Sequence, residues 1–223
     1  MNSPRPRRGP MLRGLYLITP EDADTTRLLA RVTAVLPCAS LLQYRNKPAN
    51  DAMRRRQLLA LLPACRAAGV PLIVNDDWKL AIELEADGAH LGSEDGDLRR
   101  ARDTAGDDFI LGASCYDDPR RAEAAAAAGA DYLAFGAFHP SPTKPDARRA
   151  DTQLLRDGQR HGLPLVAIGG ITPDNAAALV AAGADMVAVI SGVFDAVDPV
   201  AAARAYARHF DLPDSPFPKT PDG

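Results

Sequence analysis

Eight short apolar segments recur along the chain, and each is followed by a stretch with the periodicity of a helix. The apolar segments, often β-branched, lie at residues 14–19, 40–45, 71–75, 88–92, 109–114, 131–136, 164–169 and 185–191. The helical stretches lie near residues 24–36, 51–68, 77–86, 96–105, 118–128, 149–160, 173–182 and 196–209. Such alternation predicts βαβ units and a parallel sheet whose strands are buried on both faces.

The number of units distinguishes two α/β architectures. Eight strand–helix units within 223 residues fit one closed (β/α)8 barrel, the TIM barrel. A doubly wound open sheet is the alternative, but it would usually have fewer strands for this length. We therefore predict an α/β fold with a single (β/α)8 barrel over residues 13–210. A basic tail at 1–12 precedes it, and a proline-rich tail at 211–223 follows it.

Four predicted helices end in similar sequences, at residues 67–70, 85–90, 127–131 and 181–185. Each of these segments carries a glycine that would follow the helix, where a left-handed C-cap is expected. We interpret this internal repetition as structural rather than chemical.

Composition excludes several classes of protein. A net charge of −3 and 5% aromatic residues argue against a nucleic-acid-binding protein. Cys38, Cys65 and Cys115 are widely spaced without a CxxC motif, which indicates a reducing compartment. Neither a secretory signal nor a membrane span is apparent. We expect a cytoplasmic protein that binds neither nucleic acid nor membrane; its oligomeric state, a homo-oligomer included, stays open.

In barrels of this kind, the functional site lies where the strands end. The segment QYRNK at 43–47 offers Arg45 and Lys47, which suit phosphate oxygens, although a solvated charge cluster would look the same. The segment VNDD offers two acids. We assign Asp77 as the N-cap of the next helix, which leaves Asp76 free to point inward.

Asp95, after the next strand, would lie at the same rim as Asp76. Two carboxylates there repel each other unless a cation or a shared proton lies between them. Mg²⁺ is usually held by one or two carboxylates together with substrate phosphates. With Arg45 and Lys47 nearby, the sequence favours a metal–phosphate site over an acid/base pair.

The next strands offer fewer reactive groups. His90 lies inside its apolar segment, so we expect a hydrogen-bonded barrel histidine rather than a ligand. Ser114 lies at the rim. Cys115 has no neighbouring base and is interpreted as packing.

The last three strands end in features that suit phosphate. The loop FGAFHPSPTKPD carries Ser141, Thr143 and Lys144 between three prolines. Gly169 and Gly170 allow close backbone approach to an anion, while Thr172 and Pro173 suit the start of a helix. A Ser–Gly pair, at 191–192, follows the last strand. These features predict a phosphate cradle, and hence room for two phosphorylated ligands.

These segments in this order resemble thiamine phosphate synthase: QYRNK, VNDD, HLGSED, GAS, FGAFHPSPTKPDA, AIGGIT and AVIS. The resemblance covers about residues 13–205. The two acidic segments and the P-S-P-T-K loop are specific to that family, whereas GGI also occurs in other phosphate-binding barrels. The resemblance implies Mg²⁺-dependent joining of hydroxymethylpyrimidine diphosphate to hydroxyethylthiazole phosphate, with release of diphosphate.

The resemblance also implies residue roles. Those expected at the pyrimidine diphosphate are Gln43, Tyr44, Arg45, Asn46, Lys47, Asn75, Ser114 and Lys144. Those expected at the thiazole phosphate are Ser141, Pro142, Thr143, Gly170, Ile190 and Ser191. Asp76 and Asp95 would bind one Mg²⁺. Arg45, Lys47, Ser114 and Lys144 would assist departure of diphosphate from a carbocation-like pyrimidine.

Three positions depart from the family pattern. Asn46 and Ser93 stand where Glu and Gln are frequent, and Ser141 stands where Thr is frequent. None of these changes removes an expected metal ligand or cation.

Other activities remain open on such a barrel. A thiazole tautomerase of the same fold would carry a histidine shortly after Ser114, where this chain reads SCYDD. A Schiff-base aldolase would need Lys144 in a desolvated site rather than a polar loop. A non-catalytic phosphosugar-binding barrel would not need the complete set of acids and cations.

Overall fold

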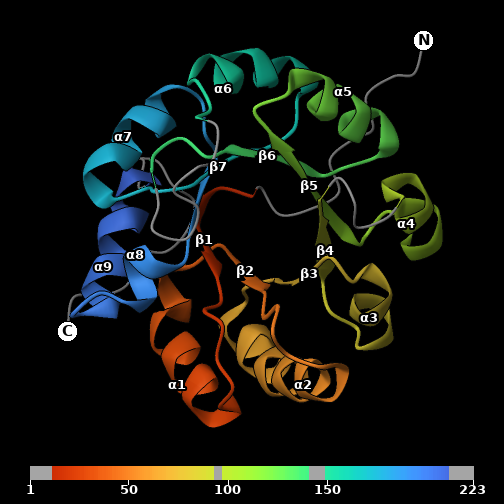
Figure 1. Ribbon diagram of the computed structural model, residues 1–223, viewed down its shortest axis with the longest axis vertical. Helices are drawn as coiled ribbons and strands as arrows, with labels where there is room; N and C mark the ends of the chain where they lie inside the picture. The colour runs from red at the N-terminus through yellow and green to blue at the C-terminus, as the bar shows by residue number, and fades with distance from the viewer. Residues whose placement is uncertain (1–11, 93–96, 141–148, 211–223) are drawn as a thin grey trace.

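The computed structural model describes residues 12–92, 97–140 and 149–210. Eight parallel strands close into one barrel in the order of the sequence, and helices surround it (Figure 1). The strands are β1 (Gly14–Ile18), β2 (Leu41–Tyr44), β3 (Leu72–Asn75), β4 (Gly88–Leu91), β5 (Ile110–Tyr116), β6 (Tyr132–Gly136), β7 (Leu165–Ile168) and β8 (Met186–Val189). The predicted single (β/α)8 barrel is therefore confirmed.

The helices follow the strands as predicted. They are α1 (Thr25–Val35), α2 (Asp51–Ala68), α3 (Trp78–Glu83), α4 (Leu98–Ala105), α5 (Pro119–Ala128), α6 (Gln153–Gly158), α7 (Pro173–Ala181), α8 (Ser191–Phe194) and α9 (Pro199–Ala207). The sequence did not predict α8, because one helical turn is too short to show a period. In the described part of the chain, no helix combines the length and apolar character that a membrane crossing needs.

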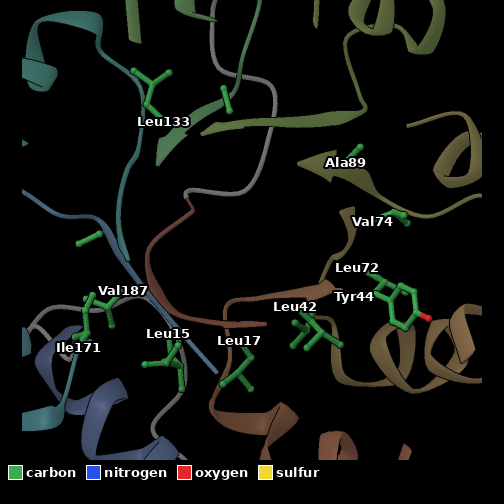
Figure 2. Packing of buried hydrophobic residues seen from close by; sticks show 14 of the residues in the cluster. Leu15, Leu17, Leu42, Tyr44, Leu72, Val74, Ala89, Leu133, Ile171 and Val187 are labelled. Atoms are coloured by element: carbon green, nitrogen blue, oxygen red, sulfur yellow. The ribbon is translucent and has the colours of Figure 1, made fainter. Parts of the chain in front are cut away.

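Side chains pack in two layers because successive residues of a strand point to opposite faces. The inner layer fills the barrel and includes Tyr16, Leu41, Ile73, Tyr132 and Met186. The outer layer lies between strands and helices; Figure 2 shows part of it, with Leu15, Leu17, Leu42, Leu72 and Val187 among the labelled residues. The barrel is thus a filled core, and its carboxyl end is the surface where inward-facing polar residues can meet a ligand.

Three of the four repeated helix endings are explained by hydrogen bonds at the amino ends of the strands. The Asp87 carboxylate accepts a hydrogen bond from the Leu72 amide at 2.8 Å, and the backbone amide of Asp87 donates to the Leu72 carbonyl oxygen. Two equivalent pairs repeat this arrangement: Asp131 with Leu111 and Asp185 with Leu165. We call these three pairs the aspartate clamps. They confirm that the repetition serves structure.

The glycines of these endings have different roles. Gly69 and Gly129 are left-handed C-caps, as predicted, and Gly183 also has a positive φ, of 111°. The prediction is wrong for Gly88, which is the first residue of β4, while Glu85 adopts the left-handed conformation, with a φ of 55°. Gly88 is required for space, since a Cβ there would lie 2.1 Å from the Ile110 carbonyl oxygen.

Candidate active site

The end of β2 contributes one buried amide and two cations. Gln43 faces the barrel interior, where its Nε2 donates to the Tyr16 hydroxyl at 2.6 Å. The Arg45 backbone is fixed by the Thr19 hydroxyl at 2.9 Å, and its guanidinium lies 3.1 Å from the Glu21 carboxylate. Lys47 is exposed. Arg45 and Lys47 are therefore placed at the rim, as the sequence predicts.

Tyr44 and Asn46 point the other way, toward α2. The Tyr44 hydroxyl donates to Gln57 Oε1 at 2.8 Å, and Figure 2 shows its ring turned away from the strands. Burial raises the pKa of Tyr44 to about 12. Asn46 Nδ2 donates to Gln57 Oε1 and to the Asp22 carbonyl oxygen. The side chains of Tyr44 and Asn46 thus hold the loop, and any contact they make with a ligand would use backbone atoms.

This arrangement explains one departure from the family pattern. Asn46 donates to two oxygen acceptors, which an ionised Glu at this position could not do. Gln57 supplies one of those acceptors, and its own Nε2 donates to the Asp22 carbonyl oxygen at 2.8 Å. Asn46 and Gln57 therefore form a matched pair of amides.

The end of β3 holds Asp76 in an unusual backbone conformation. Asp77 caps α3 by accepting from the Leu80 amide at 3.0 Å, which confirms its predicted role. Asp76 has a φ of 65°, and its amide donates to the His90 carbonyl oxygen at 2.8 Å. Asn75 beside it is half-buried. Asp76 therefore lies at the β3–β4 rim, where the sequence placed a metal ligand.

The second expected metal ligand, Asp95, lies outside the described residues, as do Ser93 and the loop residues Ser141, Pro142, Thr143 and Lys144. Among the residues that the structure describes, no three His, Cys, Asp or Glu side chains form a metal-binding group. The metal site and the loop contacts thus stay predictions.

A hydrogen-bond chain crosses the barrel interior beneath the rim. The Tyr16 and Tyr132 hydroxyls lie 2.7 Å apart, and the Tyr132 hydroxyl lies 3.0 Å from His90 Nδ1. His90 Nε2 lies 2.8 Å from Ser114 Oγ. Burial raises the pKa of both tyrosines above the usual value, so both stay protonated at neutral pH. Together with Gln43, these residues connect two strand ends that the sequence assigned to one ligand.

The expected roles of the neighbouring residues agree with this geometry. His90 is a hydrogen-bonded barrel histidine, as predicted. Cys115 is fully buried in the core, and burial raises the pKa of its thiol to about 12; both agree with its interpretation as packing. Tyr16 and Tyr132 were not predicted as part of the site, although both have a hydroxyl group and occupy inward positions of their strands.

The end of β7 forms a close backbone turn. Gly169 and Gly170 have φ values of 100° and 59°, and a Cβ on Gly170 would lie 2.2 Å from the Pro140 carbonyl oxygen. Thr172 starts α7 in a capping box with Asn175, and Pro173 occupies the first turn, as predicted. Asn175 Nδ2 also donates to the Gly170 carbonyl oxygen at 3.1 Å. This turn is therefore rigid and free of side chains at its tightest point.

The cradle predicted after β8 begins with Ile190 and the exposed Ser191, which opens α8. A Cβ on Gly192 would lie 2.3 Å from the Tyr206 hydroxyl, so that glycine is required for packing of α9. Gly170, Ile190 and Ser191 follow the neighbouring strands β7 and β8. They therefore belong to one side of the rim.

A cavity of about 300 Å³ lies at the opposite end of the barrel, between Arg13, Gln159 and Asp185. Those residues precede β1, β7 and β8 in the chain, so this cavity is at the amino ends of the strands. The closest approach of Arg13 to the Asp185 carboxylate is 3.9 Å. The cavity is remote from the acids and glycines of the candidate site, and we assign it no role in that site.

Comparison with known proteins gives a consistent result. A family model described as thiamine monophosphate synthase matches residues 15–193. The thiamine-phosphate synthase of Xanthomonas campestris pv. campestris is 56% identical over 198 residues, covering 89% of this chain and 96% of the relative. That of Aromatoleum aromaticum is 55% identical over 202 residues, covering 90% and 97%.

Solved structures agree. Thiamine phosphate pyrophosphorylase from Pyrococcus furiosus superposes with a TM-score of 0.79 at 31% identity, over 90% of this chain and 96% of that one. A 3-hexulose-6-phosphate synthase gives a TM-score of 0.67 at 16% identity, which shows a shared fold only. Because the family model spans most of the barrel and the relatives match over nearly their whole length, the chain belongs to the thiamine monophosphate synthase family and is an enzyme of the transferase class.

Proposed function

We propose that this chain joins 4-amino-2-methyl-5-hydroxymethylpyrimidine diphosphate to hydroxyethylthiazole phosphate, giving thiamine phosphate and diphosphate. The observation that carries the proposal is the division of the rim. Asp76, Arg45 and Ser114 lie on the side formed by β2, β3 and β5, while the glycine turn at Gly170 and Ser191 lie on the β7–β8 side. Two anionic ligands could therefore be held apart and still face one another.

The proposed reaction is a substitution at the methylene carbon of the pyrimidine. The bond from this carbon to the diphosphate oxygen breaks, and the electron pair leaves with diphosphate. The thiazole nitrogen then donates its lone pair to the carbocation and forms the new carbon–nitrogen bond. That nitrogen carries no proton, so the chain needs no general base for attack.

The chain's own contribution is electrostatic and positional. Arg45, Lys47 and Lys144 would neutralise the charge that grows on departing diphosphate. Gly170, Ile190 and Ser191 would hold the thiazole phosphate, with Ser141, Pro142 and Thr143 from the loop. Holding both partners in line removes much of the entropic barrier to their meeting.

The proposal includes one Mg²⁺, held by Asp76 and Asp95. Carboxylate oxygens are the donors that Mg²⁺ prefers, and Asp77 is engaged as a helix cap while Asp76 lies at the rim. When bound, the ion would supply positive charge to the diphosphate oxygens.

The direct test is incubation of the purified chain with both substrates and MgCl₂. We expect equal amounts of diphosphate and thiamine phosphate, and no joined product when either substrate is omitted. Excess EDTA should abolish turnover, and added Mg²⁺ should restore it. A folded protein that releases no diphosphate from this pair would refute the transferase proposal.

Lys144 separates this proposal from a Schiff-base aldolase. Lys144→Ala should lower kcat by roughly 10²–10³, comparable to loss of one preorganised transition-state donor. Lys144→Arg should recover part of that loss, because the charge remains. A covalent adduct on Lys144 after borohydride reduction, with no rescue by arginine, would favour the aldolase instead.

A further inference from the structure

Counting the available protons fixes which residue donates at each step of the interior hydrogen-bond chain. The chain runs through Gln43, Tyr16, Tyr132, His90 and Ser114. Gln43 Nε2 is a donor, so the Tyr16 hydroxyl accepts from it. Tyr16 has a single hydroxyl proton, which then points to its other partner, the Tyr132 hydroxyl. Tyr132 in turn directs its only proton to His90 Nδ1.

The same counting fixes the tautomer of His90. A nitrogen that accepts from Tyr132 carries no proton, so His90 is neutral with its proton on Nε2. Nε2 lies 2.8 Å from Ser114 Oγ and donates to it. Ser114 receives this bond on a lone pair, and its own hydroxyl proton is left to point toward the rim.

We infer that Tyr16, Tyr132 and His90 are positioning residues that set the Ser114 hydroxyl as a hydrogen-bond donor to the substrate. The inference rests on the proposed function, in which Ser114 meets the pyrimidine diphosphate. Diphosphate oxygens are acceptors, so a serine that serves them must donate its proton. With the chain reversed, Ser114 would donate inward to His90 and would present only lone pairs to an anion.

Packing holds the chain in place. The Tyr16 and Tyr132 rings meet edge to face with centroids 5.8 Å apart, and the His90 ring stacks on Tyr132 at 5.6 Å. Gly112 provides the space for the Tyr132 hydroxyl, because a Cβ there would lie 2.2 Å from that oxygen. Both tyrosines are almost completely buried, so water does not compete for their hydroxyl protons.

The first test reads the tautomer directly in the substrate-free protein. Nitrogen-15 NMR of histidine-labelled protein distinguishes Nδ1–H from Nε2–H, and His90→Gln identifies the His90 signals among the four histidines. We expect the Nε2–H form. Tyr132→Phe removes the donor to Nδ1 and should move the Nδ1 resonance to that of an imidazole nitrogen without a hydrogen bond. Tyr206→Phe removes another buried hydroxyl, bonded to the Ile171 carbonyl oxygen, and should leave the His90 signals unchanged.

The second test is a double-mutant cycle on turnover. Ser114→Ala should lower kcat roughly 10²-fold, as for a lost transition-state donor. Tyr132→Phe alone should lower kcat roughly 3- to 10-fold, the range of one hydrogen bond. In the Ser114→Ala background, Tyr132→Phe should cost nothing further, because its effect passes through Ser114.

The outcomes separate this inference from the proposed function. An Nδ1–H tautomer in the wild type, or additive losses in the cycle, would overturn the positioning role even if thiamine phosphate is formed. If the expected tautomer is found but no diphosphate is released, the direction of the chain stands and the proposed substrate fails.

Discussion

Asp131, just before β6, forms an ion pair with Arg102 of α4, whose side chain is almost completely buried. The Arg102 side chain is 4% exposed and that of Asp131 is 40% exposed. Arg102 also donates to the carbonyl oxygens of Gly106, Phe109 and Gly129. One aspartate clamp therefore carries a buried charge in addition to its backbone bonds, and the other two clamps do not share this partner.

Asp131→Ala should destabilise the barrel by about 3 kcal/mol, since it leaves a buried cation without its carboxylate. The three carbonyl acceptors of Arg102 keep the expected cost at the low end for such a change. The control is Asp87→Ala, which removes a clamp without an arginine and should cost about 1 kcal/mol, mainly for the unpaired Leu72 amide. Urea unfolding of both variants measures the difference; equal losses would show that Arg102 does not depend on Asp131.

The left-handed backbone of Asp76 predicts an inverted order of stability between two variants. Alanine at a φ of 65° costs about 1–2 kcal/mol, whereas glycine costs about 0.4–1 kcal/mol through the unfolded chain. Asp76→Gly should therefore be more stable than Asp76→Ala by up to about 1.5 kcal/mol, while both lose turnover.

Glu123, an exposed residue in the middle of α5, serves as the reference for that pair. In such a helix-interior position, alanine is favoured over glycine by about 1 kcal/mol, so Glu123→Ala should be more stable than Glu123→Gly. Thermal or urea unfolding of the alanine and glycine variants at both positions measures whether the order of stability is inverted at Asp76. The same order at both positions would mean that the backbone of Asp76 is not strained in solution.

Gly170 and Gly69 share a left-handed conformation but differ in their surroundings. A Cβ on Gly69 meets nothing within 4 Å, whereas one on Gly170 would collide with the Pro140 and His139 carbonyl oxygens. Gly69→Ala should cost about 1 kcal/mol of stability and keep normal kinetics. Gly170→Ala should raise KM for the thiazole phosphate at least tenfold and leave KM for the pyrimidine diphosphate nearly unchanged. Steady-state kinetics with each substrate varied in turn tests this; equal effects on both substrates would place the cradle elsewhere.

Asp22 predicts a pH dependence of stability. The Arg27 guanidinium, at 2.6 and 2.8 Å, holds the pKa of Asp22 below its ordinary value of 3.8. The stabilisation is therefore fully present above about pH 5, where Asp22 is ionised in the unfolded chain as well, and is lost as the pH falls through the lower folded pKa. Asp22→Asn should flatten this acid-side loss, and Arg27→Met should do the same by removing the partner. Urea unfolding midpoints between pH 7 and pH 2.5 measure this loss of stability. If the midpoint fell with pH as steeply in both variants as in the wild type, the Asp22–Arg27 pair would not be its cause.

Much of the fold follows from local patterns. Eight strand segments and the helices between them could be predicted because apolar runs, helix caps and turn glycines are properties of neighbouring residues. Gly88 was misread because its role depends on the Ile110 carbonyl oxygen of the next strand, which no local pattern reveals. The single turn of α8 carries too few residues to show a period.

The site was predictable in outline but not in its interior. Period-two alternation separates Gln43, which faces inward, from Tyr44 and Asn46, which face α2. The resemblance assigned all three to one ligand. The contact between Tyr16 and Tyr132 spans 116 residues and exists only because the barrel closes. Their inward positions could be deduced from the strands, but their pairing could not.

The aspartate clamps have a consequence for how the chain could be reconnected. They join β3 to β4, β5 to β6 and β7 to β8. Between β1 and β2, the Ser40 hydroxyl donates to the Leu15 carbonyl oxygen instead. The barrel is thus a ring of four two-strand modules. If the natural ends were linked and the chain reopened between modules, each clamp would stay within one continuous segment. Reopening inside a module would place the two halves of a clamp at opposite ends of the new chain.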